Sequence, residues 1–385
     1  MGCGPEGRKG RVGAGMGEEG RKPRTTNNQQ RINHEFTPMN TNARRPLWEM
    51  RLPTLTFLST VLFAVAPSQT SFAQQLVPSA PPAMAPVRPR EGMAATPAPI
   101  SVGQARVVQT GLHLRELGPV PQTEVIRADE EAAKRFANRK SAPPRVGIVR
   151  AVRNGPSSFK EVIGPGAKHA RLQAVRSSGA FGLRLHFTNF NAGSESVLVY
   201  ASTKEGTVVR GPYSGQGPGG QGHFWTASLP GDTVFVEVTG TAEPQVEVDA
   251  VVHFDRDVAS APTESAALAS LSCHLDVMCL DSTQVHPWAR DAVGRANYVS
   301  GGLNHIFSGT LLNDEDETTW MPYFLTAFHA INTQAEADSL EVAYLWQRSG
   351  CGGALPDFFN LPRNVGGRLL ASSPTDTGND MSFIL

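Results

Sequence analysis

The sequence has 385 residues, which is enough for two domains together with export and linker segments. Lysine plus arginine and aspartate plus glutamate both number 35, so the formal net charge is +0. This balance gives no support for a nucleic-acid partner or for a polybasic contact with a membrane.

A secretory signal peptide is predicted over residues 50–73. An apolar run over 55–66 follows the basic Arg51 and is too short to span a bilayer stably. The triplet Ser71-Phe72-Ala73 then provides a small-x-small cleavage pattern. A buried core helix is the alternative for the apolar run, but these flanks fit it poorly. We therefore expect a secreted protein with no membrane partner after the signal is removed.

Residues 1–49 are polar and arginine-rich, and they precede Met50, which stands where the initiator of the signal peptide belongs. We expect them to be a misassigned upstream extension; a long natural basic region ahead of the signal is the alternative. Cys3 then has no structural role. An exported protein meets an oxidising compartment, so its other cysteines can pair. They lie in the last third of the chain, as Cys273, Cys279 and Cys351.

A linker and then a β-rich region follow the signal. Residues 74–105 are rich in proline and alanine and cannot bury a core, so they are predicted to be a linker. Residues 106–256 form the next region, which includes a charged helical stretch at 128–140. Its later runs alternate apolar and polar residues between turn formers, which predicts a small antiparallel β-sandwich. These runs are RVGIVRAV (145–152), GLRLHF (182–187), SVLVYA (196–201), TVFVEV (233–238) and VEVDAVVHF (246–254).

A second linker is predicted at 257–271, and strand-like runs return over 272–385, so the whole chain is expected to be all-β. These later runs are NYVSGGL, HIFSGTLLN, MPYFLTAFHA and SLEVAYLWQR. The acidic run 314–317 is expected to be a solvated hairpin loop. The histidines show no metal-ligand spacing and no HExxH motif, so neither a metal nor a cofactor is expected.

The stretch PYFLTAFHA places His329 directly after a strand of large apolar residues. A lone histidine in such a stretch is usually structural, and Asp380 alone would be an ordinary loop aspartate. Their context argues otherwise. The stretch resembles trypsin-like serine proteases, in which a strand ending in Leu-Thr-Ala-x-His-Cys delivers the general-base histidine.

Further motifs over most of 272–385 strengthen this resemblance and are most similar to bacterial lysyl-endopeptidase-like proteases. SGTLLN (308–313) matches the strand before the histidine strand, and GGRLLASSPTDTGNDMSFIL (366–385) matches the segment that supplies the acid. Cysteines at 273 and 279 match the Cys-x5-Cys that opens their domain. VAYLWQRSGC (342–351) matches a strand that ends near a cysteine.

The resemblance implies a fold and a chemistry. Residues 272–385 would be the first β-barrel of a double-barrel protease, with a protein or peptide as substrate and Lys or Arg as candidates before the cleaved bond. The β-rich region 106–256, with its GPY and FWTASLPGD motifs, looks like the propeptides of that group and would be the propeptide here. His329 would be the general base and Asp380 the acid that orients it, in the order His, Asp, Ser of the chymotrypsin type.

The nucleophile is missing from this picture. No Gly-x-Ser-Gly-Gly motif occurs in the sequence. We therefore expect that the chain stops before its nucleophilic serine and its second barrel, and that it is inactive. The alternative function is a catalytically inactive secreted binding module built on the β-sandwich. The oligomeric state is left open by the sequence.

The resemblance also implies a disulfide pattern. Cys279 and Cys351 should pair, whereas Cys273 should lack a partner because its family partner lies in the absent half. The cysteine that follows the histidine in the family is Ala330 here, and its partner position is Ser308. Both halves of that bridge are lost together, so we interpret the change as a tolerated deletion of the bridge.

Overall fold

The computed structural model describes residues 96–102, 114–137, 143–153, 159–163, 169–240, 245–258, 276–281, 283–314, 316, 319 and 321–385. Several predicted features lie outside the described residues. They are the upstream extension, the signal peptide, most of the first linker, residues 259–271 of the second linker, Cys3 and Cys273.

One sheet has six strands in the order β1-β4-β10-β6-β7, with β3 also paired to β4. Its strands are β1 (Leu114–Leu117), β3 (Lys160–Ile163), β4 (His169–Ser177), β6 (Ser196–Thr203), β7 (Gly206–Tyr213) and β10 (Thr233–Thr239). Neighbouring strands are antiparallel except β1 and β4, which run parallel. This pair departs from the antiparallel sandwich predicted. A parallel pair needs a crossover connection, which the long chain between β1 and β4 provides.

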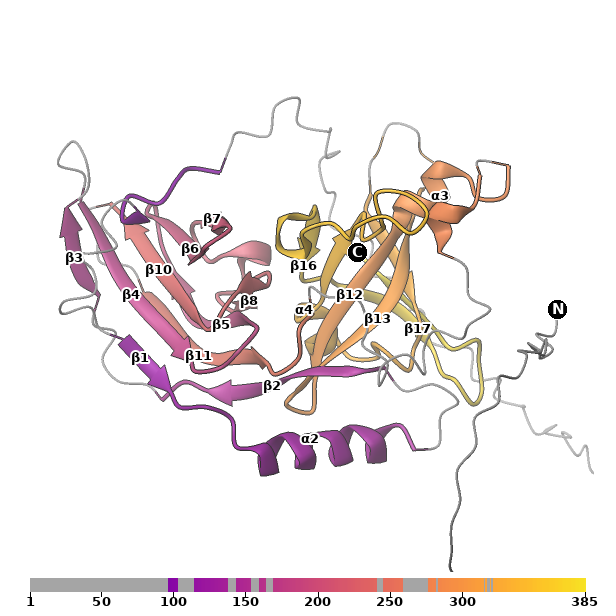
Figure 1. Ribbon diagram of the computed structural model, residues 1–385, viewed down its shortest axis with the longest axis horizontal. Helices are drawn as coiled ribbons and strands as arrows, with labels where there is room; N and C mark the ends of the chain where they lie inside the picture. Colours follow the sequence, from indigo (N-terminus) through magenta and orange to yellow (C-terminus); the bar gives the residue numbers. More distant parts are fainter. Residues whose placement is uncertain are drawn as a thin grey trace, which may run out of the picture. The chain divides into compact units, whose positions relative to one another are not determined.

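The second sheet has twelve strands, and its main path is β16-β15-β12-β13-β2-β11-β5-β8 (Figure 1). The strands from the first half of the chain are β2 (Arg145–Ala151), β5 (Gly182–Asn191), β8 (Phe224–Trp225), β9 (Leu229–Pro230) and β11 (Gln245–Phe254). Those from the second half are β12 (Val293–Ser300), β13 (Leu303–Leu312), β14 (Tyr323–Thr326), β15 (Glu341–Tyr344), β16 (Arg363–Val365), β17 (Leu369–Ser373) and β18 (Met381–Ile384). The all-β prediction is confirmed.

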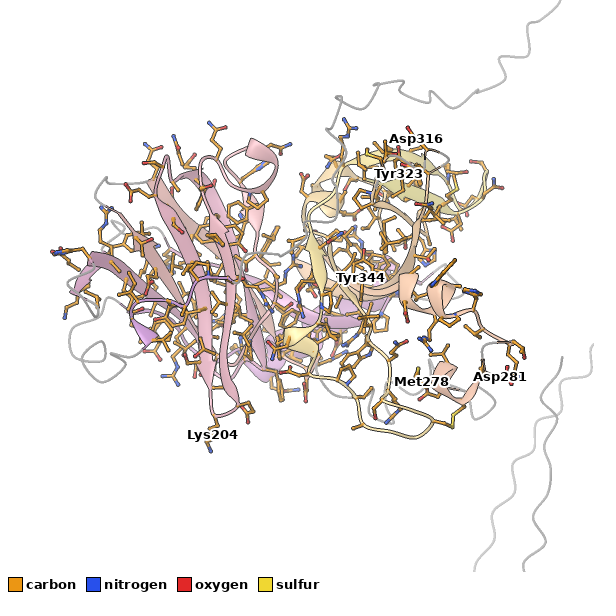
Figure 2. All side chains as sticks on the ribbon, turned by 90° about the horizontal axis from the view of Figure 1, so that it is seen from above. Lys204, Met278, Asp281, Asp316, Tyr323 and Tyr344 are labelled. Atoms are coloured by element: carbon orange, nitrogen blue, oxygen red, sulfur yellow. A yellow bond between two sulfur atoms is a disulfide. The ribbon has the colours of Figure 1, made fainter. Side chains whose placement is uncertain are left out.

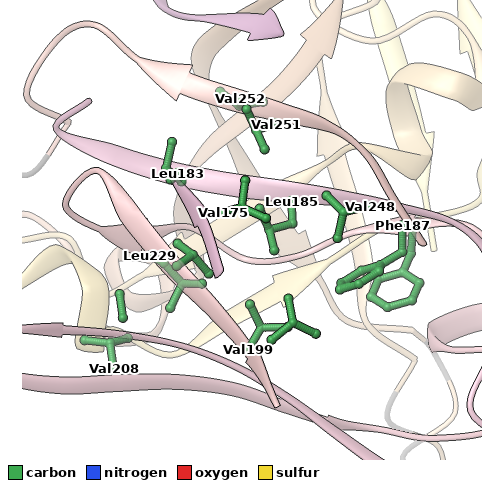
Figure 3. Packing of buried hydrophobic residues seen from close by; sticks show 14 of the residues in the cluster. Val175, Leu183, Leu185, Phe187, Val199, Val208, Leu229, Val248, Val251 and Val252 are labelled. Atoms are coloured by element: carbon green, nitrogen blue, oxygen red, sulfur yellow. The ribbon is translucent and has the colours of Figure 1, made fainter. Parts of the chain in front are cut away.

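A large apolar core lies between the first sheet and the β2-β11-β5 portion of the second (Figure 3). On β5, Leu183, Leu185 and Phe187 are completely buried, and on β6 the same holds for Val197 and Val199. Successive side chains of a strand point to opposite faces, so every second residue enters this core. The apolar residues of the alternating pattern seen in the sequence therefore form the inward face of the sandwich.

Helices are few among the described residues. Helix α2 (Gln122–Arg135) begins earlier than the charged stretch predicted, and its buried Ala128 and Ala132 pack against Ile148 and Leu303. The short helices α3 (Pro287–Ala292) and α4 (Gln334–Asp338) flank strands of the second half. None of the helices in the described part of the chain is long and apolar enough to cross a membrane.

The strands of the second half form a closed ring. Strand β12 pairs with β13, which continues through β14 and β18 to β17, while the other edge of β12 leads through β15 to β16. Because β16 and β17 belong to one segment, residues 363–373, the ring closes through that segment. Its interior holds a second apolar cluster that includes Tyr298, Phe324, Ile331 and Ile384.

Strand β2 joins the two halves of the chain. One edge of β2 pairs with β11, and its other edge pairs with β13, where Ile148 lies opposite Leu303 and Gly147 opposite Asn304. Main-chain hydrogen bonds therefore connect the region interpreted as a propeptide to the region that resembles a protease. Nothing in the sequence indicated this pairing.

Part of the first predicted linker packs on the six-stranded sheet. The buried Ser101 donates its backbone N–H to Glu237 Oε2 at 2.8 Å, and Ile100 donates to Oε1 at 2.8 Å. The Ser101 hydroxyl lies 2.6 Å from the hydroxyl of Tyr200. Residues 96–102 thus belong to the folded structure.

A disulfide joins Cys279 to Cys351, with their Cα atoms 4.4 Å apart, which confirms the predicted pairing. Cys279 ends the short 3-10 turn Val277–Cys279; Met278 of this turn and Asp281, which follows it, are labelled in Figure 2. Cys351 lies in the loop after β15. The bridge therefore ties the start of the second half to the loop beyond the strand that contains Glu341.

Candidate functional site

His329 follows β14, whose last residue is anchored to the neighbouring strand. The Thr326 hydroxyl donates to the Ser308 carbonyl oxygen at 3.2 Å. The chain then makes one helical turn, in which Ile331 N–H donates to the Ala327 carbonyl at 3.2 Å, and Ile331 is completely buried. Since both ends of this turn are fixed, His329 is held at the rim of the ring with its side chain 26% exposed.

The segment after His329 is fixed by the start of helix α4. Thr333 and Glu336 form a capping box, in which each side chain accepts from the backbone N–H of the other. The Glu336 carboxylate also accepts from Asn332 N–H at 2.9 Å. This capping leaves little freedom in the backbone that leads away from the histidine.

Asp380 lies in the loop between β17 and β18, directly before β18. Its φ of 50° is in the left-handed region, which aspartate tolerates better than most residues. Its backbone N–H donates to the Pro374 carbonyl at 3.3 Å, and the Thr375 hydroxyl donates to Asp380 Oδ1 at 2.8 Å. The loop thus holds its own carboxylate in place.

Strand register brings the two residues together from positions 51 apart in the sequence. Strands β14 and β18 are antiparallel, and Thr326 lies opposite Ser382. His329 comes just after the end of β14, and Asp380 comes just before the start of β18. In an antiparallel pair these two ends coincide, so the pairing itself places both residues at one point of the rim.

The His329 ring contacts the Asp380 carboxylate directly, with Nδ1 at 2.7 Å from Oδ2. The backbone N–H of His329 donates to Oδ1 of the same carboxylate at 3.0 Å. An ionised carboxylate can only accept, so the proton lies on Nδ1, and Nε2 is the basic nitrogen of the neutral ring. This is the geometry required of a general base with an orienting acid.

The pKa of Asp380 is lowered from its ordinary value. Partial burial acts in the opposite direction, but hydrogen bonds from the His329 ring, the Thr375 hydroxyl and the His329 backbone N–H favour the charged form. The carboxylate is therefore ionised at neutral pH and can stabilise a positive charge on the ring.

Sequence reasoning missed Thr375, the third donor to the Asp380 carboxylate. A hydroxyl in a polar loop gives no periodic signal, so only the folded loop reveals this contact. Within the described residues, no group of three His, Cys, Asp or Glu side chains is placed to hold a metal ion. The site consists of two side chains and the loop that supports them.

Comparison with known proteins relates this region to a protease family. Residues 268–384, less than half of the chain, match the family model of the lysyl endopeptidase C-terminal domain. No curated protein matches the chain, and no solved structure matches it. The matched segment contains the closed ring together with His329 and Asp380, so this part of the chain is a protease-related domain.

Proposed function

We propose that this chain is a secreted serine endopeptidase precursor, in which the trypsin-like region 272–385 carries His329 as general base and Asp380 as its orienting acid. The observation that carries the proposal is the 2.7 Å contact between the two side chains, within a segment that matches the lysyl endopeptidase family. Export through residues 50–73 and the β-rich region 106–256 as propeptide complete the proposal.

The chemistry needs both residues. Nε2 of His329 removes the proton of a serine hydroxyl while the serine oxygen attacks the peptide carbonyl, and it then gives that proton to the leaving amine. Asp380 holds the ring in the required tautomer and stabilises the imidazolium formed between these two steps. The substrate is a protein or peptide.

The nucleophile is not identified in this sequence. In the chymotrypsin order the serine follows the aspartate, and the sequence contains no Gly-x-Ser-Gly-Gly motif. We propose that these 385 residues, which offer His329 no serine in such a motif, do not hydrolyse peptide bonds on their own.

The first test uses the purified 385-residue chain and its His329→Ala variant. Neither should hydrolyse Lys or Arg esters and amides, and neither should react with a fluorophosphonate probe, because the pair has no serine to activate. Labelling of a serine in the parent chain that disappears in His329→Ala would contradict the proposed absence of a nucleophile.

The second test reads the coding DNA beyond Leu385 and expresses any longer product. An in-frame Gly-Asp-Ser-Gly-Gly-like motif is expected, and in that product Asp380→Asn should lower kcat by about 10⁴-fold with little change in KM. Asp376→Asn, an exposed aspartate in the same loop, is the matched control and should leave kcat unchanged. A stop codon without the motif would instead favour the inactive binding module.

A further inference from the structure

The boundary between the two halves of the described chain is a buried, charged interface. We call residues 96–258 the N-terminal part and residues 276–385 the C-terminal part. They are joined in sequence through 259–275 and in space through β2, β5, β13 and β15. Separation of the two parts would break contacts to buried charges, which is energetically unfavourable.

Glu341, on β15 of the C-terminal part, is completely buried and needs donors from both parts. Ser228 of the N-terminal part donates its backbone N–H to Oε1 at 2.9 Å and its hydroxyl to Oε2 at 2.5 Å. From within the C-terminal part, Arg363 donates to Oε1 at 2.5 Å and Asn297 to Oε2 at 2.9 Å. Separation would remove two of these four donors from a buried carboxylate.

Arg184, on β5 of the N-terminal part, in turn depends on hydrogen-bond acceptors in the C-terminal part. Its guanidinium is completely buried, with Nη1 donating to Asn297 Oδ1 and Nη2 to the Ser339 carbonyl, both at 2.8 Å. Its Nε lies 3.5 Å from Glu341 Oε2. Within its own part it donates to the Thr226 carbonyl. A buried charge that loses its partners is strongly destabilising, so each part stabilises a charge held by the other.

Strand addition supplies the second component of the interface. Ile306 N–H of β13 donates to the Pro144 carbonyl at 2.9 Å, and Val149 N–H of β2 donates to the Gly302 carbonyl at 2.8 Å. Without β2, this edge of β13 would present unpaired N–H and C=O groups, which readily recruit another strand. The N-terminal part thus satisfies both a charge and a strand edge.

We propose that the N-terminal part remains bound to the C-terminal part as a non-covalent subunit after the chain is cut between residues 258 and 276. The surface it recognises is the β13 edge together with the Glu341 carboxylate. This inference does not rest on the proposed protease activity. In an exported precursor, a cut in this segment would leave the two parts together, and a second event would be needed to separate them.

The test inserts the recognition sequence of a site-specific endopeptidase between residues 258 and 276 of the 385-residue chain. After complete cutting, the two fragments at 1 µM and pH 7.5 should elute together from a size-exclusion column in a 1:1 ratio. Separate elution of two folded fragments would overturn the proposal. The readout is association alone, so its failure is distinguishable from a failure of the protease assignment.

A pair of serine variants assigns the association to the Glu341 contact. Ser228→Ala removes the hydroxyl donor and keeps the backbone donor, so the cut complex should dissociate at least tenfold faster. Ser202→Ala, an exposed serine of the same part, is the matched control and should dissociate at the parent rate. Near-ultraviolet circular dichroism of the uncut variants establishes that both are folded. A folded Ser228→Ala complex that dissociates at the parent rate would contradict the role given to Glu341.

Discussion

Replacing both Cys279 and Cys351 by alanine is expected to lower the free energy of unfolding by about 4 kcal/mol. The bridge closes a loop with a sequence separation of 72 residues, which contains β12 to β15 and His329. Cross-linking such a loop removes conformational entropy from the unfolded chain, and the chain-entropy relation gives this magnitude for its length. Replacing both cysteines avoids a free thiol that would complicate the comparison.

Urea unfolding under non-reducing conditions measures the effect, with Cys3→Ala as the control. Cys3 precedes the predicted signal peptide and should contribute nothing, so its replacement should leave the midpoint unchanged. Ser308 and Ala330 cannot form a disulfide, so they cannot replace the Cys279–Cys351 bridge in the variant. A loss below about 1 kcal/mol would mean that it does not restrain the unfolded chain as the entropy relation requires.

The sequence predicted strands best where one face is buried. Strands β5, β6, β10 and β11 were found from alternation, but β4, which pairs with β1, β3 and β10 in the six-stranded sheet, was missed. Its Val175 enters the main core, while Leu172 packs with Tyr200 in a separate small cluster on the other face of the sheet. The polar Gln173 is also buried. With both faces covered, the alternation on which strand prediction depends is lost.

The contact between His329 and Asp380 was predictable because both residues occur in local motifs, whereas the buried pairing of Arg184 with Glu341 was not. His329 and Asp380 each follow or precede a recognisable strand, and register then brings them together. Arg184 and Glu341 are charged residues, which are almost never fully buried unless paired. Sequence patterns therefore place each of them at the surface, and only the folded chain shows that each is the other's partner.

We expect His305 to make the contact between β13 and β2 sensitive to acid. It is completely buried on β13, with its ring edge-on to Phe136 beyond helix α2 and Nδ1 at 3.3 Å from the Pro143 carbonyl. The pKa of His305 is lowered to about 4, mainly by burial; the hydrogen bond to Pro143 acts in the opposite direction, and the nearby arginines add to the lowering. The charged groups that face it from the packed elements are Arg135, Arg145 and Glu336.

Stability is expected to fall by about 3 kcal/mol as the pH drops from 6.5 to 4. The pKa of His305 in the folded protein lies below the ordinary value of 6.5, so the unfolded chain takes up the proton first. The contribution is complete above pH 6.5 and is lost as the pH falls towards the folded value. Glu341 acts in a lower window: burial alone would raise its pKa, but Arg363 and Arg184 hold it at about 2.

Urea unfolding at several pH values between 7 and 4 measures this slope, and His305→Phe should remove most of it while keeping a ring against Phe136. His253, whose pKa is also lowered by burial, supplies a remaining slope of the same sign. His169→Gln is the control, because His169 is exposed and its ring contacts the exposed Glu161. An unchanged slope in His305→Phe would assign the acid sensitivity elsewhere. A reduced slope would show that the acid sensitivity arises at His305, where β13 meets β2 and helix α2. Acid would then weaken the β13–β2 contact that joins the two parts.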